Sequence, residues 1–162
     1  MHNASNRACS PACDSLRAAI KMIARSARGC RVEYQLEITG SLVDVQSGDK
    51  TTISGRYRAA GTTKNGVLYL KYADDSIIDG VSIPTTLKIK PAAVTIIRQA
   101  PLAVRQEFCE GKRCSFTYQA LALVAVTHKL VIRENSLSLS YTILSQDQPI
   151  TKGELKLVYQ PV

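Results

Sequence analysis

An arginine at the end of an apolar run is the residue of this sequence best suited to bind another group. Arg98 follows the run Val94–Ile97, which has the length and composition of a buried strand. If its guanidinium turns into the protein interior it needs an acceptor, which is either an internal acid or an anionic ligand. The alternative is an arginine that bonds a carbonyl at the strand end or reaches solvent.

Tyrosine is the second residue type that could do binding chemistry. The chain has seven Tyr, two Phe and no Trp, and an inward tyrosine joins an apolar ring to a hydroxyl that can orient a ligand. The commoner role is core packing with the hydroxyl at the rim, which the alternation predicts for Tyr141 and Tyr159. The candidate ligand-binding residues are therefore Arg98, Tyr118, Tyr57 and Tyr69.

No residue pattern in the sequence predicts catalysis. His128 ends an apolar run without an identifiable partner, which is typical of a structural or solvent-facing histidine. Nucleophile elbows, phosphate loops, dinucleotide fingerprints and His-Glu-x-x-His are all missing. Residues Asp74–Gly80 do not follow the calcium-loop spacing, so we interpret them as a solvated acidic loop. We expect no enzymatic activity, no metal and no cofactor.

The net charge of +8 suggests a polyanion partner until it is divided along the chain. Residues 1–31 hold six basic residues and one acid, whereas residues 32–162 hold fifteen and twelve. The strand Arg56-Tyr57-Arg58 could stack on bases and contact phosphates, and Tyr57 could face either way. The modest charge of the larger region and the lack of Phe-rich strips disfavour nucleic acid.

Cysteine usage indicates the compartment. The odd number of five and the lack of a recognisable secretory signal predict reduced thiols and a cytoplasmic location. Cys109 and Cys114 would face each other across a hairpin turn, so a disulfide between them stays open. No apolar run approaches the roughly 20 residues of a membrane helix, and we therefore expect no transmembrane segment.

The elements that position these residues are strands. A polar tail and a basic amphipathic segment at residues 14–28 predict an N-terminal extension over residues 1–30, disordered and then helical. From residue 31 the apolar period is two, most clearly in Leu137–Ile143, and Asn65-Gly66 predicts a tight hairpin. Residues 31–162 thus form one all-β domain. Sequential hairpins favour an antiparallel up-and-down closed barrel of 8–10 strands over a sandwich.

Several sequence blocks are similar to those of a known family. They are Leu68–Tyr72, Asp74-Asp75, Thr85–Ile89, Val94–Arg98, Glu107-Phe108, Gly111 and Tyr118. This order resembles the YwiB-like proteins over about residues 32–160. The resemblance implies a small bacterial barrel of the calycin, or lipocalin-like, superfamily that is known as a domain of unknown function. Gln119-Ala120-Leu121 stands where that family usually has a Pro-Tyr-Gly turn, so this turn must be rebuilt.

Two function classes follow from these features. The first is a non-enzymatic barrel that holds a small, partly apolar ligand in its interior, with Arg98 and Tyr118 as polar anchors. The second is a structural or interaction module that contacts RNA or a protein through a basic outer face around Arg56 and Arg58. The sequence does not predict the oligomeric state or the ligand.

Overall fold

The segments in which apolar and polar side chains alternate form β-strands throughout the part of the chain that the structure describes. The computed structural model describes residues 30–162, and the predicted N-terminal helix and tail lie outside them. Among these residues no helix could cross a lipid bilayer. Ten strands follow one another along the chain: β1 (Val32–Asp44), β2 (Lys50–Lys64), β3 (Val67–Ile78), β4 (Val81–Ile89), β5 (Ala93–Arg98), β6 (Val104–Cys109), β7 (Arg113–Tyr118), β8 (Leu121–Ile132), β9 (Ser136–Ser145) and β10 (Gln148–Pro161).

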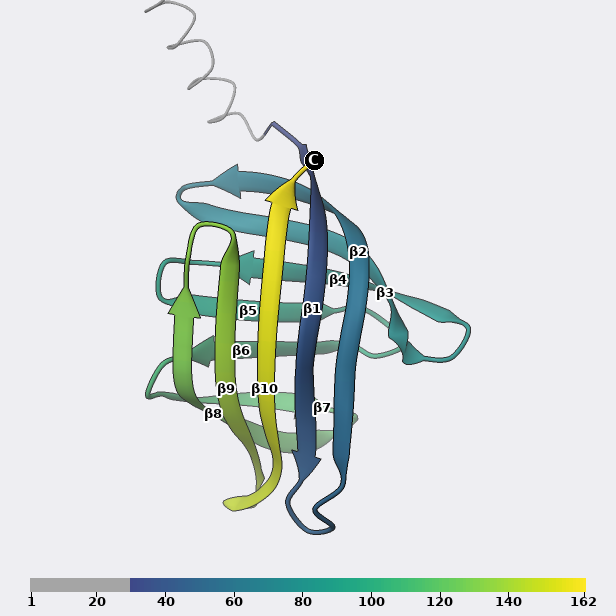
Figure 1. Cartoon of the computed structure of the whole chain (residues 1–162). Coiled ribbons are helices and arrows are strands. Elements are labelled where there is room, and N and C mark those ends of the chain that lie inside the picture. Colours follow the sequence, from purple (N-terminus) through teal and green to yellow (C-terminus); the bar gives the residue numbers. More distant parts are fainter. Residues whose placement is uncertain (1–29) are drawn as a thin grey trace, which may run out of the picture.

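The strands form a nearly closed antiparallel barrel, which confirms the predicted fold class. They pair in the order β6-β5-β4-β3-β2-β1-β10-β9-β8-β7, so that the first and last strands are neighbours. In Figure 1, β9, β10, β1 and β2 run along the front of the molecule and β4, β5 and β6 cross behind them, which flattens the ring. β6 and β7 lie against each other without a backbone ladder, so we call this junction the seam.

The interior of the flattened ring is filled by side chains from the inward positions of the strands. Phe108 and Tyr141 meet at its centre with their ring centroids 4.9 Å apart. The predicted packing role of Tyr141 and Tyr159 is confirmed, because both side chains are buried in this cluster. Burial of apolar side chains on this scale is the main stabilising contribution to such a fold.

Tight turns connect most neighbouring strands. The predicted Asn65-Gly66 turn joins β2 to β3 with both residues at positive φ, 53° and 75°. The rebuilt turn between β7 and β8 has the same hand, yet its residues are Gln119 and Ala120, at φ of 48° and 64°. Side chains other than Asn and Asp pay a steric penalty in this region because Cβ approaches the carbonyl oxygen.

This turn gives a first testable prediction. Replacing Gln119-Ala120 by Asn-Gly should raise the free energy of unfolding by about 1–2 kcal/mol, because Asn-Gly adopts the required turn with little strain. Urea denaturation of the variant and the parent measures the difference. The same exchange at Lys90-Pro91, where neither φ is positive, serves as the control and should not stabilise the protein; equal gains at both places would contradict the explanation.

Candidate functional site

Asp74 lies inside the barrel, and this overturns the interpretation of Asp74–Gly80 as a solvated loop. β3 continues through Asp74 to Ile78, and only Asp79 and Gly80 form the turn before β4. The side chain of Asp74 follows Leu70 and Tyr72 on the inward face, and the residue is 3% exposed. A carboxylate at such a position needs partners, because burial without them is costly.

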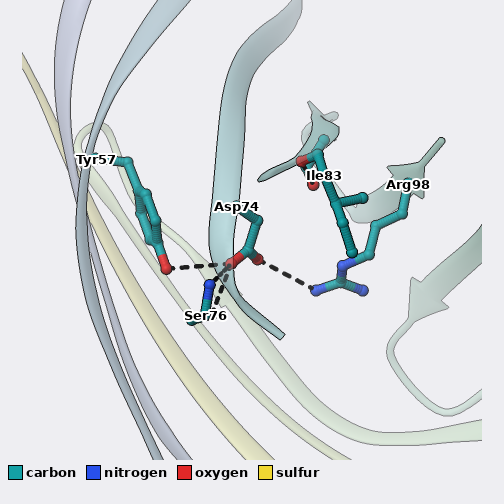
Figure 2. A network of polar contacts seen from close by, with 6 residues as sticks. Tyr57, Asp74, Ser76, Ile83 and Arg98 are labelled. Atoms are coloured by element: carbon teal, nitrogen blue, oxygen red, sulfur yellow. Dashed lines mark hydrogen bonds and ion pairs between the residues drawn. The ribbon is translucent and has the colours of Figure 1, made fainter. Parts of the chain in front are cut away.

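Three donors from two strands bind one oxygen of the Asp74 carboxylate. Tyr57 donates its hydroxyl to Oδ1 at 3.2 Å from β2. Ser76 donates both its backbone N–H, at 3.0 Å, and its hydroxyl, at 2.6 Å. Figure 2 shows these bonds meeting on one side of the carboxylate, with the Arg98 side chain extended toward the other side. The Tyr57 side chain thus faces the interior of the barrel, whereas the sequence alone allowed either face.

Strand register explains why these residues meet. Tyr72 of β3 pairs with Thr85 of β4, and Thr85 pairs with Arg98 of β5, so the three residues form one row across the sheet. Asp74 lies two residues beyond Tyr72 and therefore on the same face. Arg98 can reach Asp74 only along the inner wall. The sequence predicted a role for Arg98 with an internal acid or a ligand, and the internal acid is Asp74.

Arg98 is only partly satisfied by this partner. Its Nη2 lies 4.0 Å from Asp74 Oδ2, which is longer than a hydrogen bond. Its Nε is buried and has no hydrogen-bond partner. The arginine side chain keeps 20% of its surface exposed, against 5% for the aspartate. The guanidinium therefore lacks a partner for its Nε, and part of the side chain reaches solvent.

Aromatic rings surround the same charges. Tyr57 and Tyr72 lie 4.9 Å apart between ring centroids, tilted by 43°. Burial raises the pKa of Tyr72, the Asp74 carboxylate raises it further, and the Arg98 guanidinium opposes both. Burial likewise raises the pKa of Tyr141, and Arg98 again acts in the opposite direction. These hydroxyls stay protonated near neutral pH and can donate hydrogen bonds.

The other two predicted ligand-binding residues do not join this cluster. Tyr118 packs against the apolar core from β7 and has no hydrogen bond to the Asp74 network. Tyr69 lies on the outer face, where the Lys88 ammonium sits 5.7 Å from its ring centroid. Sequence reasoning missed Asp74, Ser76 and Tyr72. The period-two series Leu70, Tyr72, Asp74 was the signal that could have found the buried acid.

The remaining chemistry-bearing residues lie elsewhere. The outward side chains of Arg56 and Arg58 face Glu37 and Glu33 on β1, at 3.7 Å and 2.6 Å. His128 shares a 2.7 Å hydrogen bond with Thr142. Within residues 30–162, no three His, Cys, Asp or Glu side chains gather where they could hold a metal ion.

The prediction that Cys109 and Cys114 face each other across a hairpin ladder is wrong, because β6 and β7 are not hydrogen-bonded to each other. Both residues are free thiols. Cys109 ends β6 and Cys114 begins the inward series of β7, on either side of the seam, and neither forms a disulfide. Burial raises the pKa of the Cys114 thiol, and the neighbouring Cys109 raises it further. Cys114 is therefore a protonated thiol near neutral pH.

Comparison with known proteins shows the family to which this barrel belongs. Residues 38–157 match the family described as Domain of unknown function (DUF1934). The chain belongs to the DUF1934 family. The crystal structure of the ywiB protein from Bacillus subtilis has the same fold as this DUF1934 barrel, with a TM-score of 0.68 and 18% sequence identity, over 82% of this chain and 93% of that one. The predicted resemblance to YwiB-like proteins is thereby confirmed. No curated protein matches the chain.

Proposed function

We propose that this DUF1934 barrel is a non-enzymatic binding protein for a small, partly apolar molecule that carries a carboxylate or another anionic group. The single observation that carries the proposal is the incomplete pairing of Arg98. A buried Nε without a partner and an ion pair of 4.0 Å leave guanidinium donors available beside Asp74. Such donors are costly to bury and acquire partners when a ligand supplies them.

The surroundings of Arg98 support a ligand that is apolar in part. The rings of Tyr57 and Tyr72 pack against each other at a tilt of 43°. The protonated hydroxyls of Tyr72 and Tyr141 lie close enough to Arg98 to feel its charge. An aromatic wall with one fork-shaped cation suits an apolar body that ends in a planar carboxylate. Asp74 fixes the arginine and blocks its other side, so the ligand enters from the solvent-exposed side of Arg98.

The apolar core limits how deep that ligand goes. Phe108, Tyr141 and Leu87 are buried in one continuous cluster, which fills the centre of the barrel. The proposed site is therefore at the Arg98 end of the barrel, where the side chain reaches solvent, and Tyr118 is no longer an anchor in it. Free thiols at Cys109 and Cys114 support a reducing, cytoplasmic environment for the protein.

Fluorescence of 8-anilinonaphthalene-1-sulfonate, which joins an apolar body to an anion, tests the proposal. Binding to the wild-type protein should weaken about tenfold in Arg98→Met, the loss expected for a charge-assisted hydrogen bond. The matched control is Arg105→Met, because Arg105 is an exposed outward residue on the adjacent strand. Equal affinity of the two variants for the probe would overturn the proposal.

A competition experiment separates the anionic group from the apolar body. Dodecanoate should displace the fluorescent probe at lower concentration than dodecanol, since only the carboxylate engages Arg98. In Arg98→Met the two competitors should become equivalent. A preference for dodecanoate that survives the substitution would show that another cation binds the ligand.

The alternative of a basic outer face around Arg56 and Arg58 has less support. Both arginines already face carboxylates across the β1–β2 ladder. Their charge is locally neutralised, so a polyanion would have to compete with Glu37 and Glu33 for it.

A further inference from the structure

A second hollow, unrelated to Arg98, lies on the outside of the barrel over β8, β9, β10 and β1. Its volume is about 640 Å³, and hydroxyl groups and charged side chains line most of it. It is a depression that is open to solvent on its outer side. The polar lining distinguishes it from the apolar interior of the barrel.

Strand register places the polar side chains in adjoining rows. Ser140 of β9 lies between Lys129 of β8 and Glu154 of β10, and all three line the hollow. In the next row, Ser138 lies beside Lys156 of β10. Directly opposed residues have Cβ atoms only about 4.5–5.5 Å apart. The two lysines therefore flank a strip of serine hydroxyls from both sides.

A β-bulge creates the outward position of Lys129. The pairing of β8 with β9 shifts register between Thr127 and Lys129. Thr127 is buried at an inward position, so regular alternation would turn Lys129 inward as well. The extra residue His128 instead leaves Lys129 facing outward and returns Leu130 to the core. Bulges of this kind commonly re-aim side chains at functional sites.

The backbone of the third cationic residue, Arg133, is held by a buried tyrosine. The hairpin between β8 and β9 is closed by a 2.8 Å bond from the Arg133 N–H to the carbonyl of Ser136. Tyr159, which is 1% exposed, donates its hydroxyl to the Arg133 carbonyl at 3.2 Å. The backbone at Arg133 is thus fixed at the end of the hollow, and the long side chain can reach over it.

The hollow carries a net positive charge, because three cations and one acid line it. Within residues 30–162, Lys129, Arg133 and Lys156 form no ion pair, whereas Arg113 on the same outer surface lies 3.4 Å from Asp147. Glu154 is the single acid of the lining, and no aromatic ring is present there. Without rings, nucleobases and sugar faces find no stacking surface. Hydroxyls and cations are the donors that an oxyanion requires.

We propose that this outer hollow binds the phosphoryl group of a small phosphorylated molecule, over Ser138 and between Lys129, Lys156 and Arg133. The serine hydroxyls donate hydrogen bonds to the phosphoryl oxygens, and the three cations balance their charge. Glu154 weakens the binding by repulsion and marks the side of the hollow from which the phosphoryl group stays away.

Titration with glycerol 3-phosphate and with inorganic phosphate at low salt tests the site. Amide NMR signals of β8, β9 and β10 around Ser138 should shift. Lys129→Gln and Lys156→Gln should each weaken binding about two- to fivefold, the usual effect of one exposed charge pair. Glu154→Gln should strengthen binding by a similar factor of about two to five. Lys71→Gln, an exposed lysine on β3 outside the hollow, should leave the affinity unchanged.

The two probes distinguish the sources of the phosphoryl group. Tighter binding of glycerol 3-phosphate supports a phosphate ester, and equal binding supports the free anion. The proposal is overturned if neither probe binds, if the shifts appear away from Ser138, or if Lys71→Gln weakens binding as much as Lys156→Gln. Binding at this site should be unchanged in Arg98→Met, so a failure of the phosphoryl proposal is independent of the proposed site at Arg98.

Discussion

Asp74→Ala should lower the free energy of unfolding by about 3–5 kcal/mol, the range for removal of one member of a buried ion pair. The substitution leaves the Tyr57 hydroxyl and the Ser76 N–H without their acceptor. It also leaves Arg98, which is 20% exposed, without its counter-charge. For a domain of this size the melting temperature should fall by roughly 10 °C.

Two further variants make this result interpretable. Asp74→Asn keeps an acceptor of the same shape and should cost distinctly less than Asp74→Ala. Adding Arg98→Met to Asp74→Ala removes the uncompensated charge and should recover part of the stability, a positive coupling in a double-mutant cycle. Chemical denaturation of the four proteins measures it. If Asp74→Ala lowers the free energy of unfolding by less than about 1 kcal/mol, the buried network does not stabilise the barrel.

Gly40→Val should produce the second large effect, because a side chain at this position of β1 would collide with β10. A Cβ at Gly40 would overlap the backbone carbonyl of Glu154 and lie 2.9 Å from Cδ2 of Leu155. A backbone oxygen cannot swing aside as a side chain can, so the β1–β10 ladder must separate. We expect a loss of about 3 kcal/mol or more, at the upper end of overpacking costs.

The neighbouring residue provides the control for Gly40→Val. Ser41 points to the outer face of the same strand, and Ser41→Ala should change the free energy of unfolding by less than about 0.5 kcal/mol. Thermal and urea unfolding of both variants test the comparison. If Gly40→Val unfolds at the wild-type midpoint, the close approach of the two strands does not contribute to the fold.

The fold was predictable from local patterns because the residues of each strand are themselves typical of a strand. The alternation of Leu137, Leu139, Tyr141 and Ile143 gives an inward face that the structure confirms. The Asn65-Gly66 turn is equally local, since its backbone conformation favours those two residue types. The seam was not predictable in the same way. The ends of β6 and β7 resemble a hairpin, and only the packing of the whole ring separates them.

The candidate site was predictable only in part. Arg98 and Tyr57 were found because an arginine after an apolar run and a tyrosine in a strand are unusual locally. Asp74 was missed because consecutive acids next to a serine are typical of an exposed loop, and the partners that justify its burial come from β2 and β5. The outer hollow depends on how four strands curve together, which no single segment encodes.

The order of the strands also determines how the barrel can come apart. On one side, β1 to β6 form a continuous ladder, and on the other β10 to β7 form a second one. The β1–β10 pairing is the one backbone ladder between these halves within residues 30–162, and across the seam they are linked by the short turn after Cys109. Ile38 pairs with Leu157, a contact between residues far apart in sequence. We expect such contacts to form late in folding, because the entropy of closing a long loop must be overcome first. We therefore expect the barrel to open by separation of β1 from β10, which leaves two local meanders joined by the turn beside the seam.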